Sequence, residues 1–263
     1  MRSLFFNIAF GLISIFYTTG AALAALTPGR GLVRKVVKRY VNAMVWAMRV
    51  IAGIKIEVRG QERLPADGAY ILAPKHASYG DGFSIYAQFD DLAFVTGDHL
   101  ERFPLFKTVL KKLGAIVVDS CGGTEARNAL TRSAAEAHKE GRKILIYPEG
   151  NLAPPGVKYR YRTGVYHMAR DFNVPVVPVA SSLGLFWTQE NWTKKPGTAV
   201  LEFLDPIPAG TPRAELLARL EAAVEDKTAE LIAEATGRPV TPAVLQVPKA
   251  EADEIAKRAA AKR

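Results

Sequence analysis

Short apolar runs alternate with amphipathic stretches along most of the chain, from Ile54 onward. The apolar runs predict seven strands, at residues 54–59, 69–73, 92–96, 115–118, 143–147, 174–180 and 198–204. The amphipathic stretches predict five helices, at residues 82–89, 104–113, 124–140, 163–172 and 212–235. Strands interleaved with helices of this length are typical of an α/β domain. We therefore expect a central, mostly buried mixed sheet that is flanked by helices.

An uncharged segment precedes this domain, at residues 4–26. At about 1.5 Å per residue, a helix of this length could cross a hydrocarbon core of roughly 30 Å. Polar Asn7, Thr18 and Thr19 leave a re-entrant or half-buried helix open. The small residues 21–25 leave a cleaved signal peptide as a rival, although the apolar part of a signal peptide spans only about 7–15 residues. We expect a retained membrane anchor.

A second apolar periodicity follows the uncharged segment. It recurs at steps of three and four residues, as on one face of a helix, through Val33, Val36, Val37, Tyr40, Met44, Met48 and Ile51. Cations flank this face at Arg34, Lys35, Lys38 and Arg39. Two interpretations fit: an interfacial helix with its apolar side in the acyl boundary, or a helix packed on the domain core. Because the uncharged segment is adjacent, we expect the interfacial helix.

Charge is concentrated at the same end of the chain. The net charge is +9, and residues 1–63 hold ten basic and two acidic residues. The other 200 residues are therefore almost neutral, which indicates an anionic surface that meets one end of the molecule. The adjacent apolar segment favours a lipid bilayer over nucleic acid. By the positive-inside rule, the basic residues that follow the anchor predict that the downstream domain lies on the cytosolic side of the membrane.

These patterns divide the chain into three parts: a membrane anchor with a basic helix at residues 1–53, an α/β domain at 54–240, and a charged tail at 241–263. The tail, from Pro248, predicts a loose helix or a disordered segment. One cysteine, Cys121, excludes a metal site built from several cysteines. Nothing in the surrounding sequence marks Cys121 as a nucleophile. Neither phosphate-binding glycine motif occurs, nor does G-x-S-x-G or H-E-x-x-H, so we expect no metal and no bound cofactor.

One histidine stands directly after a predicted strand. His76 lies in Lys75-His-Ala-Ser-Tyr-Gly-Asp81, and ligand sites of α/β sheets gather at the carboxyl ends of strands. Asp81 follows at the start of a predicted helix, where it could accept a hydrogen bond from the His76 ring. The other ring nitrogen would then act as a general base toward a substrate hydroxyl. His138 and His167 fall within predicted helices and are expected to be surface or packed residues.

Two further segments carry candidate binding residues. Glu149 and Gly150 form a turn after the strand at residues 143–147, where a carboxylate could bind a polyol or organise neighbouring donors. Three cations follow, Lys158, Arg160 and Arg162, before a predicted helix; cations beside a helix start suit a phosphate. An ordinary surface turn and a solvated basic loop are the structural alternatives.

The combination resembles the glycerophospholipid acyltransferases, and among them most closely the bacterial 1-acyl-sn-glycerol-3-phosphate (lysophosphatidic acid) acyltransferases. The resemblance rests on the order of several blocks over residues 30–210. These are H-x-x-x-x-D at His76–Asp81, Gly114-Ala-Ile-Val-Val-Asp119, Tyr147-Pro-Glu-Gly150, Val174-Pro-Val-Val-Pro178, Gly184-Leu-Phe-Trp187 and the segment Pro196 to Pro208.

The resemblance implies transfer of an acyl group from acyl-carrier protein or acyl-CoA to the free sn-2 hydroxyl of 1-acyl-glycerol-3-phosphate, giving phosphatidic acid. It implies His76 as the general base and Asp81 as the residue that orients it. It implies that Glu149 and Gly150 help to place the glycerol or phosphate end. The expected partners are a lysophospholipid acceptor, an acyl-carrier protein or CoA thioester, and the lipid bilayer.

Two departures from the family pattern concern the acceptor. Ser120 stands where the family often has arginine, and Asn151-Leu152 stands where it usually has Thr-Arg. Lys158, Arg160 or Arg162 could supply the missing charge. Alternatively, the acceptor is another lysolipid such as lyso-ornithine lipid, or the protein binds lipid at a membrane without turnover.

Overall fold

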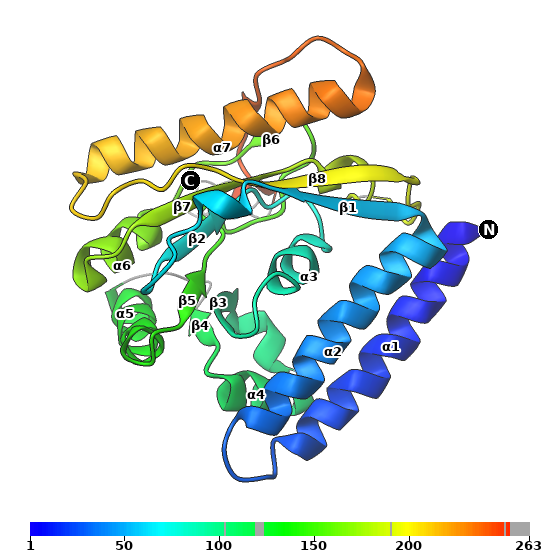
Figure 1. The fold of residues 1–263 in the computed structure, drawn as a ribbon, viewed down its shortest axis with the longest axis vertical. Helices are drawn as coiled ribbons and strands as arrows, with labels where there is room; N and C mark the ends of the chain where they lie inside the picture. The colour runs from blue at the N-terminus through cyan, green and yellow to red at the C-terminus, as the bar shows by residue number, and fades with distance from the viewer. Residues whose placement is uncertain (103, 119–123, 190, 250, 253–263) are drawn as a thin grey trace, which may run out of the picture.

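A seven-stranded mixed sheet forms the centre of the molecule (Figure 1). The computed structural model describes residues 1–102, 104–118, 124–189, 191–249 and 251–252. The strand order is β1-β8-β7-β2-β5-β3-β4. From β7 to β4 all neighbours are parallel, whereas β8 is antiparallel to β7 and parallel to β1. The bounds are β1 (Ile54–Arg59), β2 (Ile71–Pro74), β3 (Leu92–Gly97), β4 (Ile116–Val118), β5 (Lys143–Leu145), β7 (Val176–Ser181) and β8 (Gly197–Phe203).

The seven predicted strands are therefore confirmed, with ends that shift by a few residues. A separate two-stranded ladder joins β6 (Val157–Lys158) to β9 (Val244–Leu245), and neither strand was predicted. Each spans two residues, which is too short for a periodic signal. Because β9 lies at residues 244–245, the start of the predicted C-terminal tail forms a strand; residues 253–263 lie outside the described part of the chain.

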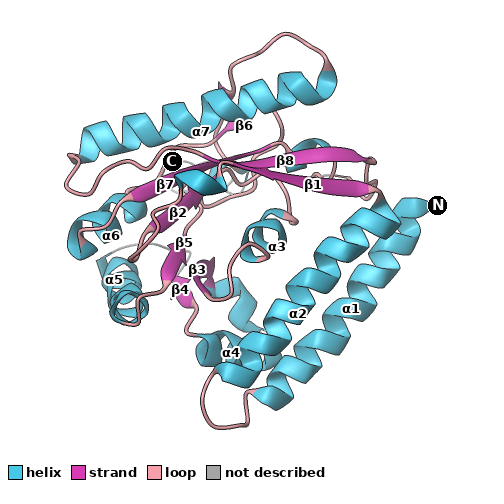
Figure 2. Cartoon of the chain, viewed as in Figure 1, coloured by secondary structure: helices cyan, strands magenta, loops and turns pink. Residues whose placement is uncertain are grey.

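Helices cover both faces of the sheet (Figure 2). Successive side chains of a strand point to opposite faces, so Ile71 and Leu72 of β2 enter different hydrophobic clusters. The first cluster includes α5 (Thr124–Lys139), α6 (Gly164–Phe172) and α7 (Arg213–Thr236). The second includes α2 (Gly31–Ala47) and α3 (Asp81–Tyr86). The five predicted helices of the domain are present, with α4 (Pro104–Leu113) matching its predicted bounds.

The N-terminal segment forms a helical hairpin, in which α1 (Arg2–Ala24) lies beside α2 (Figure 1). Near its start, Phe6 is fully buried with Met44, Met48 and Trp187. Near its end, Ala21 and Ala24 belong to a cluster with residues of α2 and α4. The hairpin therefore packs against the α/β domain along its length.

The interpretation of the α2 apolar face as lying in the acyl boundary is wrong. Val33, Met44 and Met48 have no exposed surface, because they pack on α1 and on the domain. Two of the flanking cations are also bound within the protein. Arg34 pairs with Asp91 at 3.1 Å, and Lys38 donates to the carbonyl oxygens of residues 87 and 89 at 2.9 and 2.7 Å. Periodicity alone does not distinguish a face buried in protein from one buried in lipid.

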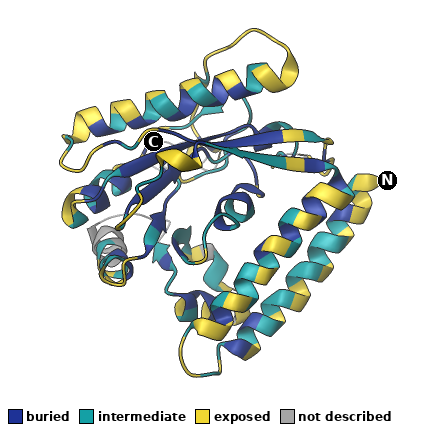
Figure 3. Cartoon of the chain, in the orientation of Figure 1, coloured by how far each residue is buried: buried dark blue, intermediate teal, exposed yellow. Residues whose placement is uncertain are grey.

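The outer face of α1 remains apolar and exposed (Figure 3). Its large exposed side chains are Leu4, Phe5, Ile8, Leu12, Ile15, Phe16 and Leu23. Among the described helices, α1 is long and apolar enough to cross a membrane by length and composition. Monomeric soluble proteins rarely expose a contiguous apolar surface of this kind.

Candidate active site

The base predicted from the sequence lies at the carboxyl end of β2, next to the start of α3. The His76 Nδ1 atom lies 3.3 Å from the Asp81 Oδ2 atom. When Nδ1 carries the ring proton, it donates to Asp81 and leaves Nε2 as an acceptor. The side chain of His76 is 22% exposed and that of Asp81 is fully buried. The pair predicted from a spacing of five is thus brought together, with the imidazole at the surface of the site.

Asp81 is held by donors other than the histidine. Its Oδ2 atom accepts the backbone N–H groups of Ala77 and Ser78, each at 2.7 Å, and the Ser181 hydroxyl donates to Oδ1 at 3.3 Å. Asp81 also begins α3, where the helix dipole favours a negative charge. Hydrogen bonds from N–H groups and a favourable dipole offset the cost of burying a carboxylate. These contacts therefore hold Asp81 in place independently of its contact with His76.

An aromatic ring lies against His76. Tyr147, two residues beyond β5, stacks on His76 with the ring centroids 3.8 Å apart and the planes at 22°. Its hydroxyl is buried and has no hydrogen-bond partner among the described residues. Burial, followed by the charge of Asp81, raises the pKa of Tyr147 well above its ordinary value, so its phenol stays protonated. The sequence contained one signal for this residue, the aromatic position of the Pro-Glu-Gly segment, but no individual role was predicted for it.

Glu149 lies close to the backbone of His76 and is 1% exposed. Its Oε1 atom accepts from the Lys75 ammonium at 2.8 Å and from the Tyr159 N–H at 2.9 Å, while Oε2 lies 3.4 Å from the His76 N–H. Burial raises the pKa of Glu149 above its usual value, and the Lys75 charge opposes this shift. Of the two roles that the sequence allowed, the observed contacts are those of a residue that organises neighbouring donors.

The three candidate cations differ in their surroundings. Lys158 donates to Glu221 of α7 at 2.6 Å. Arg160 is exposed. Arg162 is also exposed, and its backbone N–H donates to the Pro148 carbonyl at 2.8 Å. Its guanidinium lies beside Gly150, where an added Cβ atom would stand 3.1 Å from Arg162 Nε. Arg162 is thus the cation that lies against the Pro-Glu-Gly turn.

The remaining candidates lie elsewhere. His138 of α5 stacks on Phe172 at 4.9 Å, as a packed histidine does, and His167 belongs to α6 beside Tyr166. Asp119, Ser120 and Cys121 lie outside the described residues.

Comparison with known proteins agrees with this geometry. The acyltransferase family model matches residues 55–182, which include His76, Asp81 and Glu149. A 1-acyl-sn-glycerol-3-phosphate acyltransferase of Pseudomonas aeruginosa is 33% identical over 221 residues, covering 82% of this chain and 86% of that protein. The chain belongs to the acyltransferase family.

More distant similarities extend the comparison. The 1-acyl-sn-glycerol-3-phosphate acyltransferase alpha of Ovis aries is 24% identical over 181 residues, covering 65% of this chain and 60% of that protein. The crystal structure of the 1-acyl-sn-glycerophosphate (LPA) acyltransferase PlsC from Thermotoga maritima superposes with a TM-score of 0.71. It is 24% identical, and the match covers 88% of this chain and 98% of that chain. The acyltransferase therefore shares its fold with that structure.

Replacing Tyr147 tests whether its ring supports the base. We expect Tyr147→Leu to lower kcat for acyl transfer by about 10-fold, because His76 loses the flat surface that limits its ring orientations. Tyr147→Phe should stay within about twofold of wild type, since the hydroxyl that it removes has no partner. The measurement is steady-state turnover of a labelled acyl thioester. An equal loss in both variants, or none in Tyr147→Leu, would contradict the role of the ring.

Proposed function

We propose that this enzyme transfers an acyl group from a CoA or acyl-carrier-protein thioester to the sn-2 hydroxyl of 1-acyl-glycerol-3-phosphate, giving phosphatidic acid. The observation that carries the proposal is the His76–Asp81 pair at the carboxyl end of β2. Within the described residues, no serine, threonine or cysteine side chain is hydrogen-bonded to the His76 ring. The hydroxyl that His76 deprotonates is therefore supplied by the substrate.

The reaction then proceeds by direct transfer. The His76 Nε2 atom takes the proton of the acceptor hydroxyl as that oxygen attacks the thioester carbonyl carbon. Collapse of the tetrahedral intermediate breaks the carbon–sulfur bond, and the leaving thiolate receives the proton from the imidazolium. Asp81 holds the ring and stabilises its positive charge while the proton is present. The atoms balance without a covalent acyl-enzyme.

A phosphate-bearing acceptor is supported by Arg162. Its guanidinium stands at the Pro-Glu-Gly turn, whereas Lys158 is already paired with Glu221. Arg162 thus supplies charge near the place where the chain has Asn151-Leu152. An anionic phosphate there would form charge-assisted hydrogen bonds with the guanidinium.

A membrane location is supported by the outer face of α1. Leu12, Ile15 and Phe16 are each more than half exposed. The loop at residues 75–80, which carries His76, is called the catalytic loop. The inner face of α1 packs next to this loop, because Phe6 contacts Trp187 and Phe10 contacts Phe83 of α3. Since α1 follows the domain along its length, we infer that it lies half-buried in one leaflet and does not cross the bilayer. The basic N-terminal region supports the cytosolic face of the inner membrane, because the anionic lipids of that leaflet attract Lys and Arg side chains.

Removing the base tests the reaction. We expect His76→Ala to lower kcat by at least about 100-fold, because the general base is lost. His167→Ala, a histidine outside the site, should retain turnover. Phosphatidate formation from labelled acyl thioester and lysophosphatidate in detergent is the measurement, with circular dichroism as a check on folding. Well-folded wild-type protein that gives no product with any lysolipid would leave a lipid-binding protein as the better description.

A panel of acceptors tests the role of Arg162. We expect Arg162→Ala to raise KM for lysophosphatidate by about 10-fold, since a charge-assisted contact with phosphate is removed. The KM for an acceptor without phosphate, such as lyso-ornithine lipid, should not change. If wild-type enzyme prefers lyso-ornithine lipid and Arg162→Ala leaves both values unchanged, the acceptor is not a phosphate ester.

Charges placed on α1 test membrane binding. We expect Leu12→Glu with Ile15→Glu to weaken binding to vesicles of anionic phospholipid by at least about 10-fold, because two apolar contacts become charged. Ala218→Glu, at an exposed position of α7, provides a control for the added charge. Co-sedimentation with vesicles measures the effect. Unchanged binding of the double variant would place α1 outside the membrane.

A further inference from the structure

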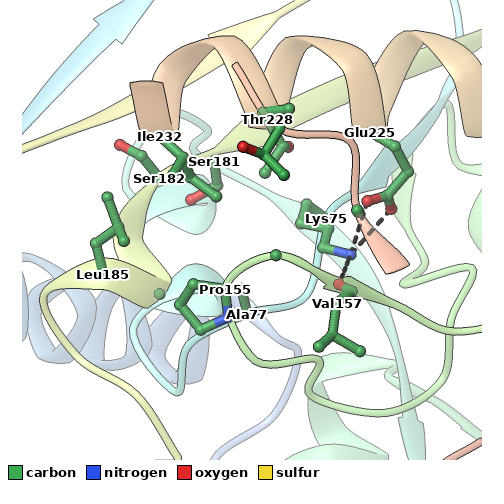
Figure 4. Close-up of a pocket in the computed structure, with 15 residues that line it drawn as sticks. Lys75, Ala77, Pro155, Val157, Ser181, Ser182, Leu185, Glu225, Thr228 and Ile232 are labelled. Carbon is green, nitrogen blue, oxygen red and sulfur yellow. Dashed lines mark hydrogen bonds and ion pairs between the residues drawn. The ribbon is translucent and has the colours of Figure 1, made fainter. Parts of the chain in front are cut away.

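Lys75, the residue before His76, is buried in an ionic cluster, of which Figure 4 shows the contacts with Val157 and Glu225. The Lys75 side chain is 2% exposed, and its ammonium donates to Glu149 Oε1 at 2.8 Å, to the Val157 carbonyl at 2.9 Å, and to both oxygens of Glu225 at 2.9 and 3.1 Å. An ammonium has three protons, and here each faces an acceptor. These acceptors thus hold the Lys75 side chain in one position.

The second carboxylate comes from a distant part of the chain. Glu225 lies on α7, 150 residues after Lys75 and beyond the segment that matches the acyltransferase family model. The Tyr161 hydroxyl also donates to Glu225, at 2.9 Å. Burying ions is costly, and apolar residues of similar volume are often at least as stable in such places. Stability alone therefore does not explain a cluster with two carboxylates and one ammonium.

The cluster is connected to the base through the backbone. Side chains alternate along β2 and the residues that extend it, so Lys75 points toward α7 while His76 points toward α3. Glu149 contacts both neighbours, with Oε1 on the Lys75 ammonium and Oε2 facing the His76 N–H. The His76 carbonyl in turn accepts from the Ala153 N–H at 2.7 Å. The backbone of His76 is thus bound by the loop that Lys75 and Glu149 hold.

A small cavity lies beside the cluster and leaves space for movement. Lys75, Ser181, Glu225 and Thr228 line it together, as Figure 4 shows. The Thr228 hydroxyl is buried without a partner among the described residues. The cavity adjoins the lysine, and the hydrogen bonds to Glu149, Glu225 and the Val157 carbonyl hold the ammonium in place. Loss of one acceptor would change the position of Glu149 and, through it, the backbone of His76.

We propose that Glu225 is a positioning residue of the active site, which acts through Lys75 and Glu149 to set the orientation of His76. This proposal rests on the proposed function, in which His76 is the base. It assigns to α7 a part in catalysis, although α7 lies on the opposite side of the sheet from the imidazole. Among the described residues, Glu225 is hydrogen-bonded to Lys75 and Tyr161 and not to His76, so its effect should fall on kcat and not on KM.

An isosteric variant tests the proposal. We expect Glu225→Gln to lower kcat by about 10- to 100-fold, because a small displacement of the base is costly, while KM for both substrates changes by less than about twofold. The matched control is Glu230→Gln, the same substitution on the same helix at an exposed ion pair with Lys227. It should leave kcat unchanged. Thermal unfolding of each variant shows whether the protein remains folded at the assay temperature.

Coupling between residues separates positioning from a purely structural effect. In the background of Lys75→Met, we expect Glu225→Leu to change kcat by less than about twofold, since Glu225 acts through Lys75 and effects within one network are not additive. A merely structural residue would lower the unfolding temperature without changing the kcat of the folded protein. Wild-type kcat in folded Glu225→Gln, or independent effects in the double variant, would overturn the proposal.

A spectroscopic readout keeps this result distinct from failure of the proposed function. The ring carbon signal of His76 in histidine-labelled protein can be assigned by its loss in His76→Ala. We expect this signal to shift in Glu225→Gln and to stay unchanged in Glu230→Gln. If wild type forms no ester with any acceptor, the proposed function fails, while the shift still reports on positioning. An unchanged His76 signal in Glu225→Gln contradicts the proposal even where the enzyme is active.

Discussion

One buried carboxylate determines the shape of the catalytic loop. Asp81 accepts hydrogen bonds from two successive backbone N–H groups and from the Ser181 hydroxyl, and it faces the His76 ring. A buried charge without these donors would be strongly disfavoured, so the loop must close around it. The orientation of the imidazole follows from that closure. Tyr147 in addition stacks on the face of the imidazole ring.

Elements on both faces of the sheet contact the same loop. On one face, α3 begins at Asp81 and provides the local environment of the base. On the other face, Lys75 extends toward α7 and meets Glu225. Glu149 contacts groups on both sides. The helix α7, which lies outside the segment that matches the acyltransferase family model, thus supplies an acceptor to the residue that precedes His76.

The N-terminal hairpin connects the candidate site to an exposed apolar surface. The inner side of α1 packs on Trp187 and on Phe83, close to the catalytic loop, and its outer side is a continuous row of exposed apolar residues. One side of α1 therefore packs on protein, and the other side is an exposed apolar surface. Under the proposed function, this surface would bring His76 near the bilayer that holds the acceptor and the product.

Several features of this protein could be predicted from its sequence because they depend on local patterns. The seven strands follow from short apolar runs, and the proximity of His76 to Asp81 follows from a loop that turns directly into a helix. The family resemblance added the order of the blocks. These signals lie within stretches of a few residues, where backbone geometry allows only a few kinds of secondary structure.

Only the tertiary structure decided the remaining features. The burial of the α2 face against α1, the stacking of Tyr147 on His76, and the pairing of Lys75 with Glu225 all join residues that lie far apart in the sequence. Periodicity shows that a side chain is apolar or charged, but it does not identify the partner. For Val33 and Met44 that partner is protein and not lipid, and for Lys75 it is a carboxylate from another helix, because packing of the whole chain brings them together.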